Sequence, residues 1–330
     1  MVTRFAQQVT NLIKSLQVFF ITLQLITTSN STMEQFILQP LQVLRRGLRL
    51  VGVGSEVQDR RGKISNVQQF RSIFGPHPNH AAKCWNEMIV ERQLVDVKEI
   101  SLLGFFLALN FLRVYPRSET LRSALFGNIE LKRARDLTWK WINFIDLMYQ
   151  YKIFWPISFD SIFVASMDGS HKKSNEKRHP ELRKDPKIFS YKHHRAGFNV
   201  QVVLHCFQDK IMDVFVARGG QNDMGNVNDS QVCQKIPAGK RCVVDGGYVG
   251  KLDKFSGYNQ FDSDEVKHFK KRVKARHETI NKRMNDYRVM DDQWRHNRDK
   301  FPACARAVSI LIQYGLEDTD PESANPLFNA

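Results

Sequence analysis

The sequence predicts an α/β protein in which an all-helical region precedes a mixed sheet flanked by helices. Up to about residue 150, apolar residues recur at three- and four-residue steps, which is typical of amphipathic helices. After Pro156, short β-branched and aromatic runs are separated by Gly, Asp and Asn, which is typical of strands. A long helical stretch follows the strands, and this order indicates a mixed α/β domain.

In the helical part, the pattern is clearest over residues 97–114 and 132–151. A Gly/Pro break at residues 74–78 is followed by Asn79, which we expect to cap a helix over residues 81–90. Ser118 should cap a further helix. Short helices with sharp breaks over residues 34–155 allow a DNA-binding helix-turn-helix. Many helical domains with the same pattern do not contact DNA, so both interpretations of this region stay open.

Residues 156–330 should form the sheet-containing domain. We predict strands over residues 162–167, 198–206, 210–217 and 241–245, with a hairpin turn at Gln208 and Asp209. The polar, basic stretch 171–195 resembles a loop. Residues 262–290 should form one long helix, because capping and acidic residues stand at its start.

The N-terminal segment, residues 1–33, has an apolar run over residues 16–26. This run could be the core of a signal peptide, but Gln17 and Gln24 interrupt it and it is too short to span a bilayer. The alternatives are an amphipathic helix, or upstream sequence before a start at Met33. We favour these alternatives and expect no membrane association, because nothing later in the chain resembles a secreted protein.

The net charge is +15, from 49 Lys and Arg against 34 Asp and Glu, and it favours polyanionic partners such as DNA, RNA or an anionic membrane surface. The 5 cysteines are scattered and form no C-x-x-C pair, which argues against a disulfide framework and a structural zinc site. Reduced thiols fit a nuclear or cytosolic protein.

Two aspartates, Asp168 and Asp245, each close an apolar β run and precede glycine. An acid at the carboxyl end of a strand lies where open α/β sheets form ligand crevices, and glycine leaves room for a metal or phosphate. Each Asp-Gly pair also has an ordinary explanation as a turn dipeptide. Finding two such sites in one basic domain favours the functional interpretation.

A third acid would come from the long helix. Glu278 lies away from the apolar stripe of that helix, among Lys271, Lys274 and Lys282, which are candidate DNA-binding residues. Glu278 with Lys282 is also an ordinary i,i+4 pair on a solvated face. Helical spacing by itself does not select Glu278 over Glu265.

Three converging carboxylates would suit phosphodiester chemistry. Two Mg²⁺ or Mn²⁺ ions about 3.5–4 Å apart can activate the attacking oxygen and stabilise the leaving oxygen. Such hard cations take oxygen ligands. In this scheme Asp168 bridges both ions, Asp245 binds one and Glu278 binds the other. If this triad is misplaced, Asp160, Asp229 and Glu265 are the next candidates.

Several segments in order resemble the PIF/Harbinger-type transposases, a family of DDE superfamily endonucleases. Residues 167–171 (MDGSH) are similar to the first acidic motif and residues 243–249 (VVDGGYV) to the second. Residues 276–284 (RHETINKRM) resemble the glutamate-bearing helix, 33 positions after Asp245. Residues 220–223 (GQND) resemble the motif at the end of the third strand, which makes Asp223 an auxiliary candidate, with Asp229 a weaker match. Upstream similarity extends the resemblance over roughly residues 70–330.

The resemblance implies an RNase H-like fold, a divalent metal (Mg²⁺ or Mn²⁺), DNA cleavage and strand transfer in the nucleus. It also implies a separate Myb-like DNA-binding partner and allows a homo-oligomer. Asn285 departs from the family, which commonly has Lys there, and a phosphate contact would be weaker as a result. The alternative hypothesis is a domesticated, catalytically inactive DNA-binding or scaffolding protein of the same fold.

Overall fold

The computed structural model describes residues 33–53, 65–175, 186–248 and 250–318. The predictions for the N-terminal segment, apart from Met33, lie outside these residues, as does the middle of the predicted loop 171–195. No helix within the described ranges is long and apolar enough to cross a membrane.

The described N-terminal part is helical, as predicted. Its helices are α2 (Pro40–Leu50), α3 (Asn66–Phe74), α4 (Pro78–Asn86), α5 (Leu102–Val114), α6 (Glu119–Leu125), α7 (Leu131–Leu147) and α8 (Tyr149–Lys152). Ser118 caps α6 as expected. The predicted cap Asn79 is wrong, because α4 begins at Pro78 and the His77 side chain accepts the Asn79 N–H. The predicted helix 97–114 starts later, at Leu102, where the Ser101 side chain caps it.

Six strands form one sheet: β1 (Phe163–Lys173), β2 (Phe189–Ser190), β3 (Arg195–His205), β4 (Ile211–Arg218), β5 (Arg241–Val244) and β6 (Phe255–Ser256). Their order is β2-β3-β1-β5-β6, and β4 also pairs with β3. β1, β3 and β4 are antiparallel neighbours, whereas β5 runs parallel to β1 and β6 parallel to β5. The sheet is therefore open and mixed, as the order of elements predicted.

Strand β1 is longer than predicted. It does not end before Asp168 but continues to Lys173, because pairing with β3 persists over that length. Only the parallel pairing with β5 ends at Met167, opposite Val244. The predicted loop 171–195 is likewise wrong at both ends, since β1 extends into it and β2 lies within it.

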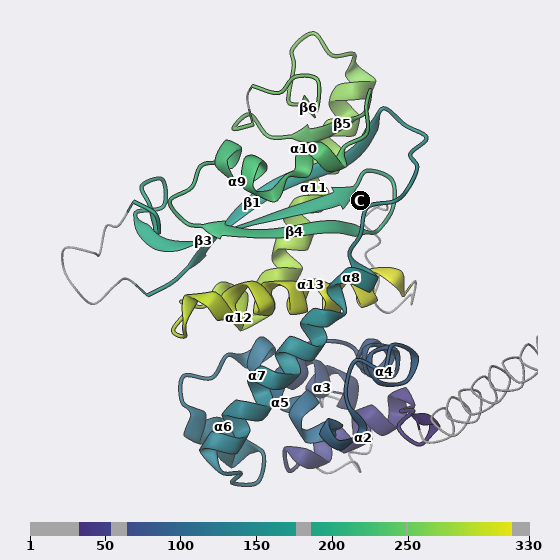
Figure 1. The fold of residues 1–330 in the computed structure, drawn as a ribbon, viewed down its shortest axis with the longest axis vertical. Coiled ribbons are helices and arrows are strands. Elements are labelled where there is room, and N and C mark those ends of the chain that lie inside the picture. Colours follow the sequence, from purple (N-terminus) through teal and green to yellow (C-terminus); the bar gives the residue numbers. More distant parts are fainter. Residues whose placement is uncertain (1–32, 54–64, 176–185, 249, 319–330) are drawn as a thin grey trace, which may run out of the picture.

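The two faces of the sheet pack against different helices. In β3, the side chains of Phe198, Val200, Val202 and Leu204 join the larger core, whereas Val203 joins a separate core with residues of α9 (Asp223–Ser230) and α10 (Val232–Lys235). This alternation is the two-residue period of a strand buried on both faces. Helices thus flank the sheet on both sides (Figure 1).

The long C-terminal helix is interrupted. We predicted one helix over residues 262–290, but α11 (Asp264–Asn285) ends before Tyr287, whose extended backbone separates it from α12 (Arg288–Asp291). Ser263 caps α11, and Asp264 and Glu265 lie in its first turn as expected. Helix α13 (Phe301–Glu317) has no counterpart among the predicted elements.

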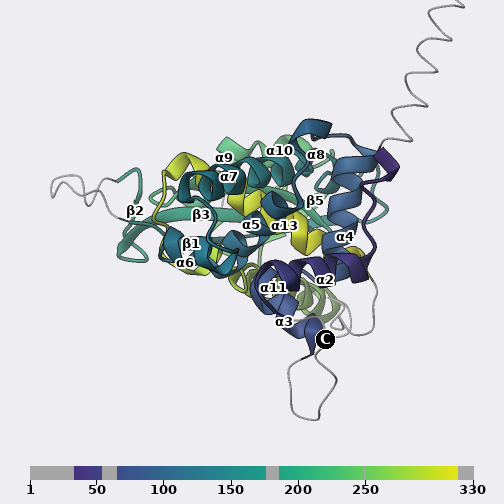
Figure 2. The same cartoon turned by 90° about the horizontal axis from the view of Figure 1, so that it is seen from below.

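Helix α13 joins the helical region to the sheet. It lies between strand β4 and helices α4 and α7, and Figures 1 and 2 show it between these layers. One continuous core holds residues of the N-terminal helices, strands β3 and β4, and α13. The boundary predicted near residue 155 therefore does not separate two hydrophobic cores. The helix-turn-helix stays a prediction.

Phe301→Ala should lower the free energy of unfolding by about 3–5 kcal/mol, because it removes a fully buried aromatic ring. The Phe301 ring stacks on Phe198 of β3 at 4.2 Å between centroids and meets Trp294 at 5.2 Å. Urea unfolding followed by circular dichroism measures the change. Phe261→Ala, at an exposed position, should change it by less than about 0.5 kcal/mol. Equal effects of the two substitutions would contradict this packing role.

Candidate active site

Asp168 and Asp245 lie side by side. Met167 of β1 is paired with Val244 of β5 in the parallel register, so the next residue on each strand is an aspartate. β1 and β5 are far apart in sequence and are adjacent only in the sheet. The structure thus brings together two of the three predicted catalytic acids at the point where the parallel pairing ends.

The Asp168 carboxylate is destabilised by its surroundings. Burial raises its pKa above the ordinary value, and the negative charges of Asp245 and Asp223 raise it further. The backbone N–H of Gly169 donates to Asp168 Oδ1 at 2.9 Å and partly opposes this shift. Added positive charge would therefore stabilise the ionised form of Asp168.

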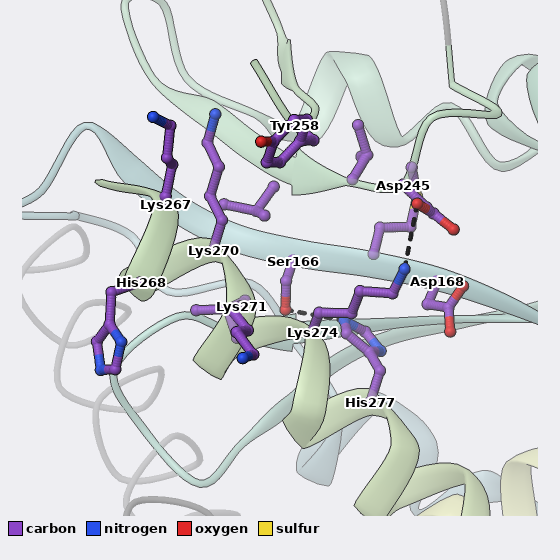
Figure 3. A pocket seen from close by; sticks show the side chains of 14 residues that line it. Ser166, Asp168, Asp245, Tyr258, Lys267, His268, Lys270, Lys271, Lys274 and His277 are labelled. Carbon is purple, nitrogen blue, oxygen red and sulfur yellow. Dashed lines mark hydrogen bonds and ion pairs between the residues drawn. The ribbon is translucent and has the colours of Figure 1, made fainter. Parts of the chain in front are cut away.

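Asp245 has the opposite shift. The N–H of Gly246 donates to Asp245 Oδ1 at 2.9 Å and lowers the pKa of this more exposed carboxyl. The Lys274 ammonium lies 3.3 Å from the same oxygen and lowers the pKa further. Figure 3 shows Lys274 reaching from α11 toward Asp245, with Asp168 beside it. The positive charge at the aspartate pair is therefore supplied by Lys274.

Helix α11 is anchored against β1 by a buried polar contact. His277 Nε2 lies 2.8 Å from Ser166 Oγ, and both side chains are almost fully buried. Burial lowers the pKa of His277 to about 3, with Arg276 adding to the shift, so the ring is neutral at pH 7. Ser166 and Asp168 are two apart on β1, so both side chains lie on the face covered by α11.

Glu278 is next to this anchor, one helical turn beyond Lys274 and on the same face of α11. Its side chain is exposed, and it makes no hydrogen bond or ion pair with another described residue. Lys271 and Lys282 are also exposed on α11. Among the described residues, no three His, Cys, Asp or Glu side chains are arranged closely enough to hold a metal ion. The structure therefore does not bring Glu278 to the two aspartates.

The auxiliary candidate Asp223 lies behind β1. It is the first residue of α9, and a β-carbon built at Gly169 would lie 3.8 Å from Asp223 Oδ1. A β-carbon at Gly247 would collide with Asp223 Oδ2, so the Asp223 side chain would have to move if residue 247 were larger. Gly169 faces away from α11 because Asp168 faces toward it. Asp223 thus adjoins the aspartate pair from the opposite side of the sheet.

Tyr248 completes this rear group. Its Oη is 3.5 Å from the position of a β-carbon at Gly169 and has no hydrogen-bond partner, although the side chain is buried. Burial raises the pKa of Tyr248, and the charges of Asp223 and Asp168 raise it further. The phenol is therefore a neutral donor held next to two carboxylates.

The remaining acidic candidates lie outside this arrangement. Asp229 accepts a hydrogen bond from the Gln221 side chain at 2.7 Å, and Asp160 and Glu265 are exposed. None of the three lines the cavity that contains Asp168 and Asp245. The geometry thus favours Asp223 over Asp229 as the neighbour of the aspartate pair.

Asn285 stands where the resemblance implies a lysine, and it contacts a lysine of strand β1. The buried Lys172 of β1 donates to Asn285 Oδ1 at 2.6 Å. Burial lowers the pKa of Lys172 to about 8. An ammonium group from β1 therefore lies beside the position where the resemblance implies a lysine on the helix.

Sequence patterns did not point to Ser166, His277 or Tyr258 as site residues. All three line the same cavity as the two aspartates. The contact between Ser166 and His277 joins positions 111 apart, and no local pattern signals it. Comparisons with protein-family models, curated proteins and solved structures found no match for this chain.

Proposed function

We propose that this protein is a metal-dependent DNA endonuclease of the transposase type. The observation that carries the proposal is the pairing of Asp168 and Asp245 beside the lysine-bearing face of α11. A carboxylate pair provides oxygen ligands for hard cations, and a strongly basic chain favours a polyanionic substrate. The motif resemblance to PIF/Harbinger transposases supports the same reaction.

The strand arrangement supports an RNase H-like fold. Three antiparallel strands, β4, β3 and β1, are followed on the far side of β1 by the parallel strands β5 and β6. An RNase H-like domain has this arrangement of five strands, which here are β1, β3, β4, β5 and β6. The DDE enzymes carry their acids on the first of these strands, after the fourth and on a later helix. Asp168, Asp245 and Glu278 occupy corresponding positions along β1, after β5 and on α11.

The residues that would hold the metal are Asp168, Asp245 and Glu278. The raised pKa of Asp168 indicates negative charge that a cation would stabilise. Glu278 lies one turn after Lys274 on the same face of α11, and in this proposal its carboxylate would join the aspartate pair when the metal binds. Mg²⁺ or Mn²⁺ bound there would supply Lewis-acid stabilisation of the phosphodiester oxygens. Asp223 would support the site from behind.

Lys274→Met should increase the affinity of the DNA-free protein for Mn²⁺ by up to about fivefold. The reason is that the Lys274 ammonium now neutralises Asp245, and an exposed pair of this kind is worth about 0.2–1 kcal/mol. Isothermal titration with Mn²⁺ measures the change. Lys282→Met, on the same helix, is the matched control and should leave the affinity unchanged. Weaker Mn²⁺ binding in Lys274→Met would contradict the competition.

The DNA path would follow α11. Exposed Lys271 and Lys282 lie on this helix on either side of Lys274, and such residues contact phosphates without reading sequence. The resemblance further suggests a nuclear protein that acts with a Myb-like DNA-binding partner, and it allows a homo-oligomer.

The experiment that tests the proposal is nicking of supercoiled plasmid by the purified full chain. Nicking with Mn²⁺, its loss in EDTA and its loss in Asp245→Asn are the expected results. Metal-independent nicking, or nicking that persists in the variant, would contradict the proposal.

A second candidate function is a catalytically inactive DNA-binding or scaffolding protein. The observation that favours it is that Lys274 pairs with Asp245, while no three acidic side chains among the described residues are close enough to hold a metal ion. This candidate predicts salt-sensitive DNA binding without nicking, and no rise in thermal stability on adding Mn²⁺. Adding a Myb-like partner to the nicking assay distinguishes the inactive protein from a nuclease that requires its partner, because only the nuclease would then nick the plasmid.

A further inference from the structure

A cavity of about 640 Å³ lies between α11 and the sheet and opens at the aspartate pair (Figure 3). Asp168 and Asp245 line it together with Val243 of β5 and Val273 of α11, whose buried side chains belong to one hydrophobic cluster. Its volume is in the range of sites for small organic groups, about 300–1,000 Å³. A planar, largely apolar group bound here would lie directly beside the two carboxylates.

An exposed aromatic ring stands over this cavity. Tyr258 lines it although its side chain is 78% exposed. The segment that carries Tyr258 is held on both sides by one buried lysine, because Lys270 Nζ donates to Gly257 O at 2.7 Å and contacts Asp262 Oδ2 at 2.6 Å. The segment that carries the ring is therefore held in place, while the ring itself stays open to solvent. Such a ring can stack on a planar ligand at little cost in entropy.

The cavity also contains one unsatisfied polar atom. His277 lines it and is 3% exposed, and its Nδ1 has no hydrogen-bond partner while Nε2 contacts Ser166. A buried polar atom without a partner is costly, and a ligand that offers one hydrogen bond would offset that cost. The neutral ring offers Nδ1 as donor or acceptor according to its tautomer.

The rim of the cavity is cationic. Lys267, Lys271 and Lys274 follow one another at spacings of four and three along α11, so they lie on one face of the helix, and all three line the cavity. Lysines at the rim and an apolar interior suit a ligand that joins anionic groups to a planar apolar one. A nucleotide within a DNA strand has this chemistry.

We propose that the cavity receives a single unstacked nucleobase of the DNA next to the phosphate that is cut. The base stacks on Tyr258 and hydrogen-bonds His277 Nδ1, while the rim lysines contact the flanking phosphates. Enzymes that take a base out of the stack hold it by aromatic stacking and edge hydrogen bonds in this way. The inference rests on the proposed function and adds that the substrate has an unpaired nucleotide near the scissile bond.

The test is DNA affinity, measured by fluorescence anisotropy with the full chain in EDTA, so that it does not depend on cleavage. Three short duplexes are compared: one fully paired, one with a single unpaired adenine nucleotide, and one with an abasic nucleotide at that position. The phosphate contacts are shared by all three, so the comparison isolates the base. We expect the unpaired adenine to bind about tenfold more tightly than the abasic control, in line with stacking of one base.

Variants of Tyr258 test whether this ring is responsible for the preference for the unpaired adenine. Tyr258→Ala should reduce the tenfold preference to within about twofold, and Tyr258→Phe should keep it because the ring remains. Phe261→Ala removes an exposed ring that does not line the cavity and should also keep the preference. Tyr258 is mostly exposed, so its substitution should not unfold the chain.

The outcomes separate the two proposals. Equal binding of the adenine and abasic duplexes, or a preference unchanged in Tyr258→Ala, would overturn the proposal that the cavity binds a base. The plasmid assay would still test the proposed nuclease activity. Binding to none of the duplexes would overturn both proposals. A preference for the unpaired adenine that depends on Tyr258 supports the pocket whether or not cleavage is observed.

Discussion

Asp168→Asn and Asp245→Asn should each reduce metal-dependent nicking by at least about 100-fold while changing DNA affinity by less than about threefold. Even groups that only support a metal ligand are worth about 10–100-fold, so direct ligands should exceed this range. The two side chains adjoin one another across β1 and β5, and each substitution removes one oxygen ligand without changing side-chain volume. Plasmid nicking and anisotropy, measured on the same preparations, separate cleavage from binding.

The same variants should change stability in opposite directions when measured in EDTA at pH 7. The folded-state pKa of Asp168 is raised, so its ionisation opposes folding; this cost appears as the pH rises from the ordinary value of 3.8 through the raised pKa. Asp168→Asn should therefore raise the melting temperature. The folded-state pKa of Asp245 is lowered, so its ionised form stabilises the fold above pH 3.8, and this stabilisation is lost as the pH falls through the lowered pKa.

Asp245→Asn should thus lower the melting temperature slightly, because Asp245 and Lys274 are both well exposed and solvent screens their attraction. Scanning calorimetry of the two variants gives both shifts. A lower melting temperature for Asp168→Asn would show that Asp168 is not destabilised by its neighbours in the metal-free protein.

Glu278→Gln should also reduce nicking by at least about 100-fold, whereas Asp223→Asn should reduce it by about tenfold. Glu278 lies on the helix face that Lys274 uses to reach Asp245, whereas Asp223 adjoins the pair from the other side of the sheet. Asp223 is therefore placed to support the ligands, and loss of such support typically costs 10–100-fold. Because Glu278 is exposed, Glu278→Gln should change the free energy of unfolding by less than about 0.5 kcal/mol.

Glu265→Gln is the matched control for Glu278→Gln. It changes the same type of side chain on α11, but in the first turn of the helix, nine residues before Lys274, so nicking should persist. A larger loss of nicking in Asp223→Asn than in Glu278→Gln would identify Asp223 as the third metal ligand. It would also contradict the assignment of Glu278, which rests on the motif resemblance.

The sequence by itself determined the type of most elements. Three- and four-residue periodicity identified α5, α7 and α11, and β-branched runs identified β1, β3, β4 and β5, because these patterns depend on local geometry. The Asp-Gly pairs at residues 168 and 245 marked the two acids, although the sequence did not show that they are neighbours. Helix α13 was not predicted; it is buried on most of its surface, and a helix without a polar face lacks a clear amphipathic pattern.

Only the tertiary structure decided which residues meet. The β1 and β5 register pairs Met167 with Val244, and thereby places Asp168 beside Asp245, through hydrogen bonds between segments far apart in the chain. The same holds for His277 with Ser166, for Asp223 behind Gly169, and for Tyr258 over the cavity. Local spacing cannot specify these contacts, because strand register and helix packing are set by the burial of side chains from the whole chain.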